Sequence, residues 1–255
     1  MSAVVLAGAS GAPGVTTTAL GLTLAWPGDC LLVDADRSAP QTLLAGYLQG
    51  QAATAGLEAV LQAHRERTPL AEALDGAIRP IPGPPGDAGR RGFLPGFSHL
   101  GAVDLFDQAW QPLLAEFAAQ DRDVVIDAGR TGHRGLPEAL LRDAGLVALV
   151  CRTSLIGLAG ARLHLAALLD HGPLDRVGLI LVGPGRPYPA AEVAEQFGVP
   201  VLAEIAWDPA SADDLHAGHA SMGRRWPRGA LARSFARAAT RLHAATRREE
   251  VRVAP

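Results

Sequence analysis

A glycine-rich loop joins an apolar strand candidate, Ala3 to Ala7, to an apolar helix candidate, Thr16 to Trp26; its residues 9–18 read Ala-Ser-Gly-Ala-Pro-Gly-Val-Thr-Thr-Thr. A strand, such a loop and a helix in succession are the setting of the phosphate-binding loop G-x-x-x-x-G-K-[ST]. There, backbone N–H groups and the positive end of the helix attract an anion. The segment therefore predicts a phosphate site at the start of the helix; the alternative is a turn without a ligand.

The loop departs from this pattern at its charged position. Gly14 and Thr16 are in the expected places, but Ala9 replaces the first glycine. Val15 replaces the lysine, and no other lysine can substitute, because all 23 basic residues are arginines. Losing one charge-assisted contact costs about 1.5–3 kcal/mol, and the lost cation would also have stabilised charge on a transferred phosphoryl group. We therefore expect nucleotide binding with slow or absent hydrolysis.

Further strand candidates end in polar residues. They are the apolar runs Cys30 to Asp36, Asp123 to Gly129 and Leu146 to Arg152, the last followed by a helix candidate from Leu158 to Leu169. Apolar runs that alternate with helical patterns predict a single doubly wound, mostly parallel α/β sheet with helices on both faces. Ligands of such sheets bind beyond the carboxyl ends of the strands. Asp34, Asp36 and Asp127 are therefore predicted to gather near the loop.

These segments resemble the ParA/MinD family of deviant Walker ATPases, from about Ala3 to Leu242. The family loop K-G-G-x-G-K-[ST] aligns with Ser10 to Thr16, so that both of its lysines are missing, at Ser10 and Val15. The resemblance implies ATP or ADP with Mg²⁺ as the cofactor. The residues that it implies at the nucleotide are Gly11, Ala12, Pro13, Gly14, Val15, Thr16, Thr17, Asp208 and Pro209.

The same resemblance implies roles for three side chains. Thr16 would be a magnesium ligand, and Asp127 would hold the metal through water. Asp36 would orient the attacking water, as the catalytic residue. Phe197–Val201 resembles the family's late strand, and Ile205–Pro209 the loop flanking the base.

The stretch Gly14 to Leu20 is similar to an actinobacterial MinD-like subgroup with the loop G-x-P-G-V-T-T-T and, more loosely, to the CpaE/TadZ proteins that position pilus machinery. This implies a positioning or scaffolding factor for chromosome partitioning, septum placement or pilus and secretion machinery, with a protein partner and a homodimer as its assemblies. Two alternatives stay open. One is a nucleotide-free interaction platform. The other is an active ATPase whose missing cation is replaced by an arginine beyond a strand end: Arg37, Arg130, Arg134 or Arg152.

Composition fits one domain over residues 1–255, because 48% of the residues are hydrophobic and the length suits a single large α/β unit. No apolar run reaches the length of a membrane span, and no charged region precedes the first apolar stretch. Cys30 and Cys151 fall on predicted buried strands, as reduced thiols do. We therefore expect a cytoplasmic protein. The histidines show no metal-ligand spacing, and His216 is expected to be solvated.

Two segments stand apart from this pattern. Residues 80–92 are rich in proline and glycine and predict a mobile loop before a strand at Phe93 and Leu94. Residues 224–255 hold nine arginines and two glutamates, a balance of +7 on a chain whose net charge is −3.

The basic segment contains a predicted amphipathic helix over 229–248. Its apolar stripe consists of Leu231, Phe235, Ala238, Leu242 and Ala245, and the opposite side carries Arg233, Arg237, Arg241 and Arg248. The arginines are either a solvated face or a contact for non-specific DNA or an acidic partner. A membrane-surface helix is the weaker option, because small alanines dominate the stripe.

Overall fold

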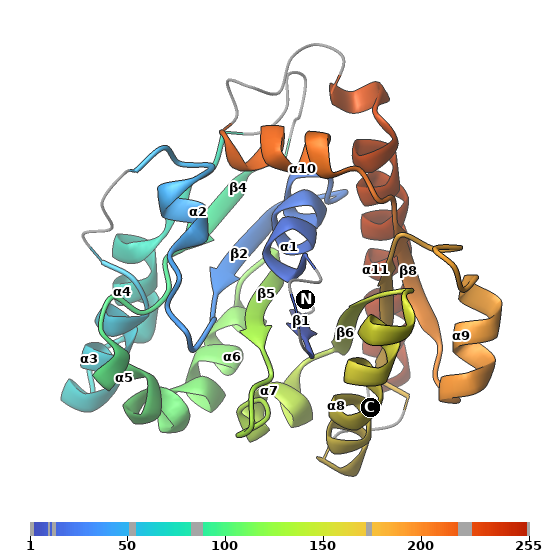
Figure 1. Cartoon of the computed structure of the whole chain (residues 1–255). Helices are drawn as coiled ribbons and strands as arrows, with labels where there is room; N and C mark the ends of the chain where they lie inside the picture. The colour runs from blue at the N-terminus through green and yellow to red at the C-terminus, as the bar shows by residue number, and fades with distance from the viewer. Residues whose placement is uncertain are drawn as a thin grey trace.

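The computed structural model describes residues 3–9, 11, 14–50, 55–82, 89–171, 175–218 and 226–253. Its centre is an eight-stranded sheet in the order β3-β4-β2-β5-β1-β6-β7-β8 (Figure 1). All neighbouring strands are parallel except β3 and β4. The strands are β1 Ala3–Gly8, β2 Cys30–Asp34, β3 Arg79–Pro80, β4 Arg91–Leu94, β5 Asp123–Arg130, β6 Leu146–Arg152, β7 Val177–Val182 and β8 Val201–Ile205.

Helices cover both faces of this sheet. They are α1 Val15–Leu24, α2 Thr42–Ala45, α3 Leu57–Glu66, α4 Leu70–Ala77, α5 Leu100–Leu105, α6 Trp110–Ala119, α7 Glu138–Asp143, α8 Leu155–His171, α9 Ala190–Phe197, α10 Pro209–His216 and α11 Ala230–Val253. Short 3₁₀ turns span Phe106–Ala109 and Trp226–Arg228. The prediction of a doubly wound, mostly parallel sheet is confirmed.

Two hydrophobic clusters form the core, one on each face. Along β1, Val4 and Leu6 belong to the cluster that includes α1, α2, α10 and α11, whereas Val5 and Ala7 belong to the cluster that includes α3 to α9. Because successive side chains of a strand point to opposite faces, the unbroken apolar run of β1 serves both clusters. This explains why the central strands are apolar throughout rather than alternating.

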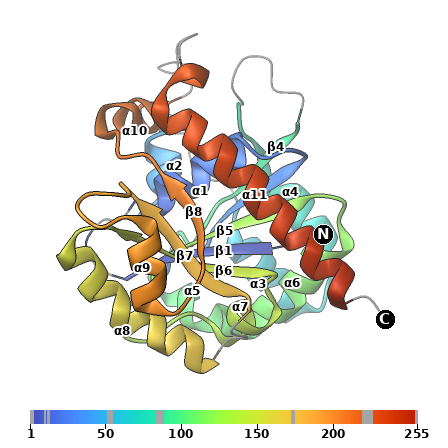
Figure 2. The same ribbon diagram turned by 90° about the vertical axis from the view of Figure 1, so that its right-hand side faces the viewer.

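Helix α11 lies across one face of the sheet (Figure 2). Leu231, Phe235, Ala238 and Leu242 of its predicted stripe are buried, and Ala245 is partly buried. The ring of Phe235 fills the space that a side chain at Gly21 of α1 would need. The helix is longer than predicted, because residues 249–253 continue it.

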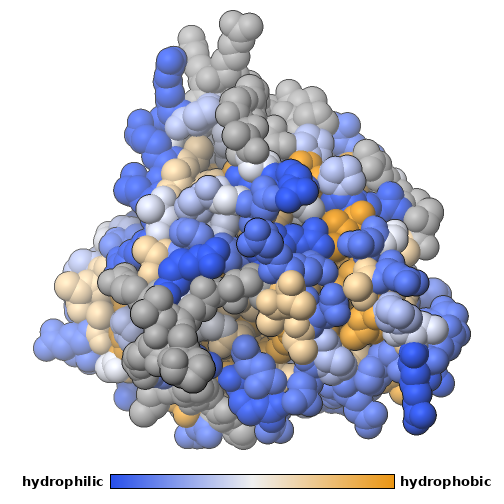
Figure 3. Space-filling model, turned by 180° about the vertical axis from the view of Figure 1, so that it is seen from behind, coloured by the Kyte–Doolittle hydropathy of each residue, from blue (hydrophilic) through white to orange (hydrophobic). Residues whose placement is uncertain are grey.

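Three of the four predicted arginines of α11 face solvent, and the side chain of the fourth, Arg248, lies outside the described residues. Arg233, Arg237 and Arg241 are exposed, and Arg241 also donates a 2.9 Å hydrogen bond to the Val201 carbonyl. Seen from behind, the coloured surface of the molecule is mostly hydrophilic, with hydrophobic residues in scattered groups (Figure 3).

Some element boundaries differ from the sequence prediction. Both ends of the predicted 80–92 loop pair as strands, since β3 ends at Pro80 and β4 begins at Arg91; residues 83–88 lie outside the described residues. The strand at Phe93 and Leu94 is confirmed.

The late strand begins later than predicted. Phe197 is the last residue of α9, and Gly198 ends that helix in the left-handed conformation, with φ 65°, which a glycine adopts without strain. The strand itself starts at Val201. Helix α8 also begins earlier than predicted, at Leu155. In the part of the chain that the structure describes, no helix is long and apolar enough to cross a membrane.

Candidate functional site

The glycine-rich loop leads into α1 as predicted. Gly14 precedes the helix in the left-handed conformation, with φ 89°, and its carbonyl accepts the first helical hydrogen bond from the Thr18 N–H at 2.8 Å. Among the described residues, no side chain caps this end of α1, so that no such acceptor meets its first N–H groups there. Gly11 is exposed, also with positive φ. Ser10, Ala12 and Pro13 lie outside the described residues.

Val15, at the position of the missing lysine, belongs to the hydrophobic core. Its side chain is 6% exposed and lies in the same cluster as Val4, Leu6 and Leu215. Position 15 is thus a packing position in this chain. Any phosphate at the loop would be held there by backbone N–H groups and the helix end.

Thr16 and Asp127 meet next to this helix end. The Thr16 side chain lies beside the Asp127 carboxylate, which accepts the Gly129 N–H at 3.0 Å. Asp127 is 1% exposed, and its burial raises the pKa of the carboxyl to about 6. The motif thus brings together the two residues predicted to hold magnesium.

Asp34 is paired in register with Asp127, on the neighbouring strand. Burial, followed by the charge of Asp127, raises the pKa of Asp34 to about 7. Asp34 Oδ1 accepts the N–H of Asp36 at 3.2 Å. Each of two neighbouring buried carboxyls disfavours the ionised form of the other. A cation nearby would reduce this repulsion and stabilise both ionised forms.

Asp36 lies in the loop that follows β2, against the end of β5. Its Oδ1 accepts the Ser38 N–H at 2.8 Å, and its carboxyl occupies the space that a side chain at Gly129 would need. Asp34, Asp36 and Asp127 are therefore gathered as predicted, on one side of the start of α1.

A cavity of about 250 Å³ opens next to the start of α1. Gly14 and Thr17 line it, and so does Pro209, one of the two predicted base-flanking residues. Arg152, at the end of β6, also lines it, with its guanidinium carbon 4.4 Å from the centre of the Trp207 ring. This is a cation–π contact, which leaves a positive charge beside the helix end.

Asp208 lines the same cavity, but its carboxylate caps α10. It accepts the Ser211 N–H at 3.1 Å and the Ser211 hydroxyl at 2.7 Å, and these bonds hold the pKa of Asp208 below its usual range. The structure thus gives Asp208 a capping role that the sequence analysis did not assign.

His216 is partly buried rather than solvated, contrary to the prediction. Its Nε2 lies 2.8 Å from the Thr17 hydroxyl, and burial lowers the pKa of the imidazole. Its Nδ1 is buried without a hydrogen-bond partner among the described residues. No local sequence signal predicts this contact, because 199 residues separate the two side chains.

The other three predicted arginines are engaged elsewhere or exposed. Arg37 and Arg134 both contact Asp104 Oδ1 of α5, at 3.4 and 2.5 Å, while Arg130 is exposed at the end of β5. Of the four candidates, Arg152 alone lines the cavity beside the loop. No group of three or more His, Cys, Asp or Glu side chains within the described ranges could hold a metal ion.

The fold is that of known ParA and MinD proteins. A ParA family ATPase from Chlorobium tepidum TLS superimposes with a TM-score of 0.73 at 17% identity, covering 94% of this chain and 98% of that one. MinD from Pyrococcus horikoshii OT3, complexed with Mg-ADP, gives 0.70 at 20% identity, over 94% and 95% of the two chains. A McdA–ATP complex from Cyanothece gives 0.62 at 15%, over 95% and 96%. The sequence matches no protein-family model and no curated protein.

Proposed function

We propose that this chain is a ParA/MinD-like protein that binds adenine nucleotide with Mg²⁺ and acts as a positioning or scaffolding factor, with slow or absent ATP hydrolysis. The observation that carries the proposal is the position of Thr16, at the start of α1, beside the buried Asp127 carboxylate. The solved ParA, MinD and McdA structures with the same fold, two of them with nucleotide bound, support it.

The residues present fit a magnesium ion that arrives with the nucleotide. Mg²⁺ takes oxygen ligands, commonly one or two carboxylates together with substrate phosphates. Thr16 would supply its hydroxyl, and Asp127 would act through a water molecule. The bound ion would neutralise phosphate charge, and the raised pKa of Asp127 marks a carboxyl whose ionised form a cation would stabilise.

Slow or absent hydrolysis follows from Val15. With a buried aliphatic side chain at the lysine position, no cation there stabilises charge on a transferred phosphoryl group. In this proposal Asp36 would orient water, and its carboxylate accepts the Ser38 N–H. In this proposal, nucleotide occupancy rather than turnover sets the protein's state.

Two measurements test the proposal. One is equilibrium binding of fluorescent ATP and ADP, with and without Mg²⁺, and the other is phosphate release from ATP. We expect saturable, magnesium-dependent binding and little or no release. Thr16→Val removes the hydroxyl and keeps the shape, so it should weaken binding in magnesium by about tenfold. Thr240→Val, on the exposed side of α11, is the matched control and should bind normally. An absence of binding would favour the nucleotide-free platform.

Arg152 supports a second candidate, the active ATPase with a substitute arginine. It lines the cavity that Gly14 and Thr17 also line, so its charge is close to the start of α1. If this candidate is right, phosphate release is measurable and Arg152→Gln abolishes it, while Arg130→Gln leaves it intact. Release that both variants preserve would argue against a role of Arg152.

The proposed assemblies are a homodimer and a complex with a protein of a positioning or assembly system. Because Ser10 cannot carry the charge of the family's signature lysine, we propose that dimerisation depends little on nucleotide. Sedimentation velocity with and without Mg-ATP checks this. A clean monomer-to-dimer switch on adding Mg-ATP would contradict it.

A further inference from the structure

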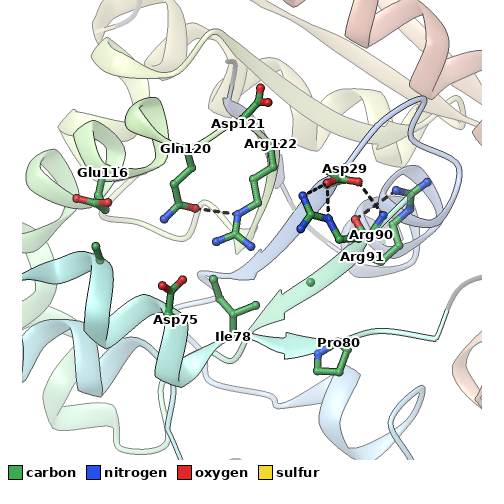
Figure 4. Close-up of a pocket in the computed structure, with 13 residues that line it drawn as sticks. Asp29, Asp75, Ile78, Pro80, Arg90, Arg91, Glu116, Gln120, Asp121 and Arg122 are labelled. Atoms are coloured by element: carbon green, nitrogen blue, oxygen red, sulfur yellow. Dashed lines mark hydrogen bonds and ion pairs between the residues drawn. The ribbon is translucent and has the colours of Figure 1, made fainter. Parts of the chain in front are cut away.

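A second, larger cavity lies at the opposite edge of the sheet. Its volume is about 590 Å³, and Cys30, Arg91 and Gly92 line it where β2 and β4 begin (Figure 4). Arg122 stands at the start of β5, and Asp75 comes from α4. The candidate nucleotide site lies beyond the carboxyl ends of the strands, whereas this cavity lies where strands begin. The two cavities are therefore separate.

Two arginines that line this cavity are bound to neighbouring groups of the chain. Arg90 donates to both oxygens of Asp29, through its N–H at 2.8 Å and its Nε at 2.7 Å. Arg91 is buried and donates to the carbonyls of Trp26 and Gly28, at 2.8 and 2.5 Å. These bonds fix the loop before β2 and give the cavity a firm side.

Arg122 is held differently. Its Nε donates to Gln120 Oε1 at 2.8 Å, and this is its one hydrogen bond within the described part of the chain. The guanidinium reaches over Gly92, since a Cβ there would lie 3.9 Å from Nη1. Gln120 thus binds the Nε edge of the guanidinium and fixes its orientation. The two Nη groups remain available for a ligand. This fork matches the two oxygens of a carboxylate.

Asp75 supplies the opposite charge across the cavity. Its carboxylate points toward the Gln120–Arg122 pair (Figure 4) and interacts electrostatically with Arg122. The two side chains form no ion pair within 4 Å among the described residues, so space remains between them. Glu116 and Asp121 add negative charge to the rim. The volume lies in the range of small-molecule sites.

We propose that this cavity binds a zwitterion, with the ligand's carboxylate on the Arg122 fork and its cationic group at Asp75. A cavity of about 590 Å³ is large for a simple amino acid and has room for a long cationic side chain. The ligand class is therefore a basic amino acid, either free or as the C-terminal residue of a peptide. This proposal does not depend on nucleotide binding.

Isothermal titration calorimetry of the full chain with L-arginine and with the peptide Gly-Gly-Arg tests the proposal. Agmatine, which lacks the carboxylate, and the C-terminally amidated peptide are the matched ligands. We expect at least one of the two carboxylate ligands to bind, and its matched ligand to bind at least tenfold more weakly. Binding of the peptide alone would identify a chain end as the source of the zwitterion.

Variants locate the two contacts. Arg122→Gln and Asp75→Asn should each weaken L-arginine or peptide binding at least tenfold. Arg233→Gln, with the same loss of charge on exposed α11, should not. Absence of binding by both ligands, or equal binding by Arg122→Gln and the unchanged protein, would overturn the proposal. If Arg122→Gln fails to fold, the comparison of L-arginine with agmatine on the unchanged protein still decides.

Discussion

The Asp36 carboxyl lies directly against the Cα of Gly129, in the space that any side chain at position 129 would occupy. Gly129 also has a left-handed backbone, with φ 60°. The loop after β2 can therefore pack against the end of β5 because position 129 has no side chain. This contact keeps Asp36 beside the buried Asp127.

Gly129→Ala should therefore displace Asp36 and destabilise the fold. Gly132 is the matched control, because its φ is also positive, at 57°, and a Cβ there meets nothing within 4 Å. Both alanine variants carry the cost of a left-handed backbone, about 1 kcal/mol or more. Gly129→Ala should lose about 1–3 kcal/mol beyond that, from overpacking. Urea denaturation measures both, and equal losses would show that Asp36 is not wedged against Gly129.

Val15→Lys should destabilise the protein rather than simply restore a phosphate-binding lysine. Position 15 is buried in the hydrophobic cluster below the loop, and a buried, unpaired charge costs several kcal/mol. We expect the unfolding free energy to fall by about 2–5 kcal/mol relative to Val15→Met, whose side chain is similarly long and uncharged. Thermal and urea unfolding without nucleotide compare the two. Equal stability would mean that a lysine at this position reaches solvent at the loop.

The free energy of unfolding should fall as the pH rises through the range in which Asp34 and Asp127 lose their protons. Their pKa values of about 7 and about 6 lie above the roughly 3.9 of an unfolded aspartate. The folded state therefore holds protons that the unfolded chain releases above about pH 4, and its stability decreases up to about pH 7. One pKa unit corresponds to about 1.4 kcal/mol.

Asp34→Asn should flatten this decrease, because the amide cannot ionise. Asp214→Asn, at an exposed position of α10, is the control and should keep the slope. Urea denaturation at intervals from pH 5 to 8 measures the effect. A stability that rises with pH over this range would contradict the assigned burial of Asp34 and Asp127.

The sequence predicted the parts of the site that local motifs encode. Thr16 follows the glycine loop, and Asp36 and Asp127 follow strands, so topology alone brings them to one edge of the sheet. The contact of His216 with Thr17 could not be predicted, because it depends on where α10 folds back onto α1. Trp207 and Arg152 meet for the same reason, since each follows a different strand. The predicted start of β8 at Phe197 is too early. Gly198 and Pro200 follow the end of α9 and are turn residues, but they lie inside the segment that resembles a strand.

The exposed arginines of α11 predict an electrostatic contact with a polyanion. If the ligand is DNA, binding should be independent of base sequence, with a logarithmic salt slope of about −0.9 for each phosphate contacted. Replacing Arg233, Arg237 and Arg241 by glutamate should abolish it without unfolding the core, because these side chains face solvent. A control with the same charge change replaces three exposed arginines elsewhere: Arg65, Arg67 and Arg162.

Gel shift with random duplex DNA at low and near-physiological salt measures this contact. An acidic protein partner would show the same salt trend without any affinity for the duplex. No shift at low salt, or an equal loss of binding in both triple variants, would mean that the α11 arginines are a solvated face.

The central claim is that Asp127 holds magnesium when nucleotide is bound. Titration of fluorescent ATP into the unchanged protein and into Asp127→Asn, each with Mg²⁺ and with EDTA, tests it most directly. Asp121→Asn, just before β5 and exposed, is the matched control. We predict that Mg²⁺ strengthens ATP binding of the unchanged protein and of Asp121→Asn by tenfold or more, and that Asp127→Asn loses this gain while keeping its affinity in EDTA. An equal gain from Mg²⁺ in Asp127→Asn would contradict the account.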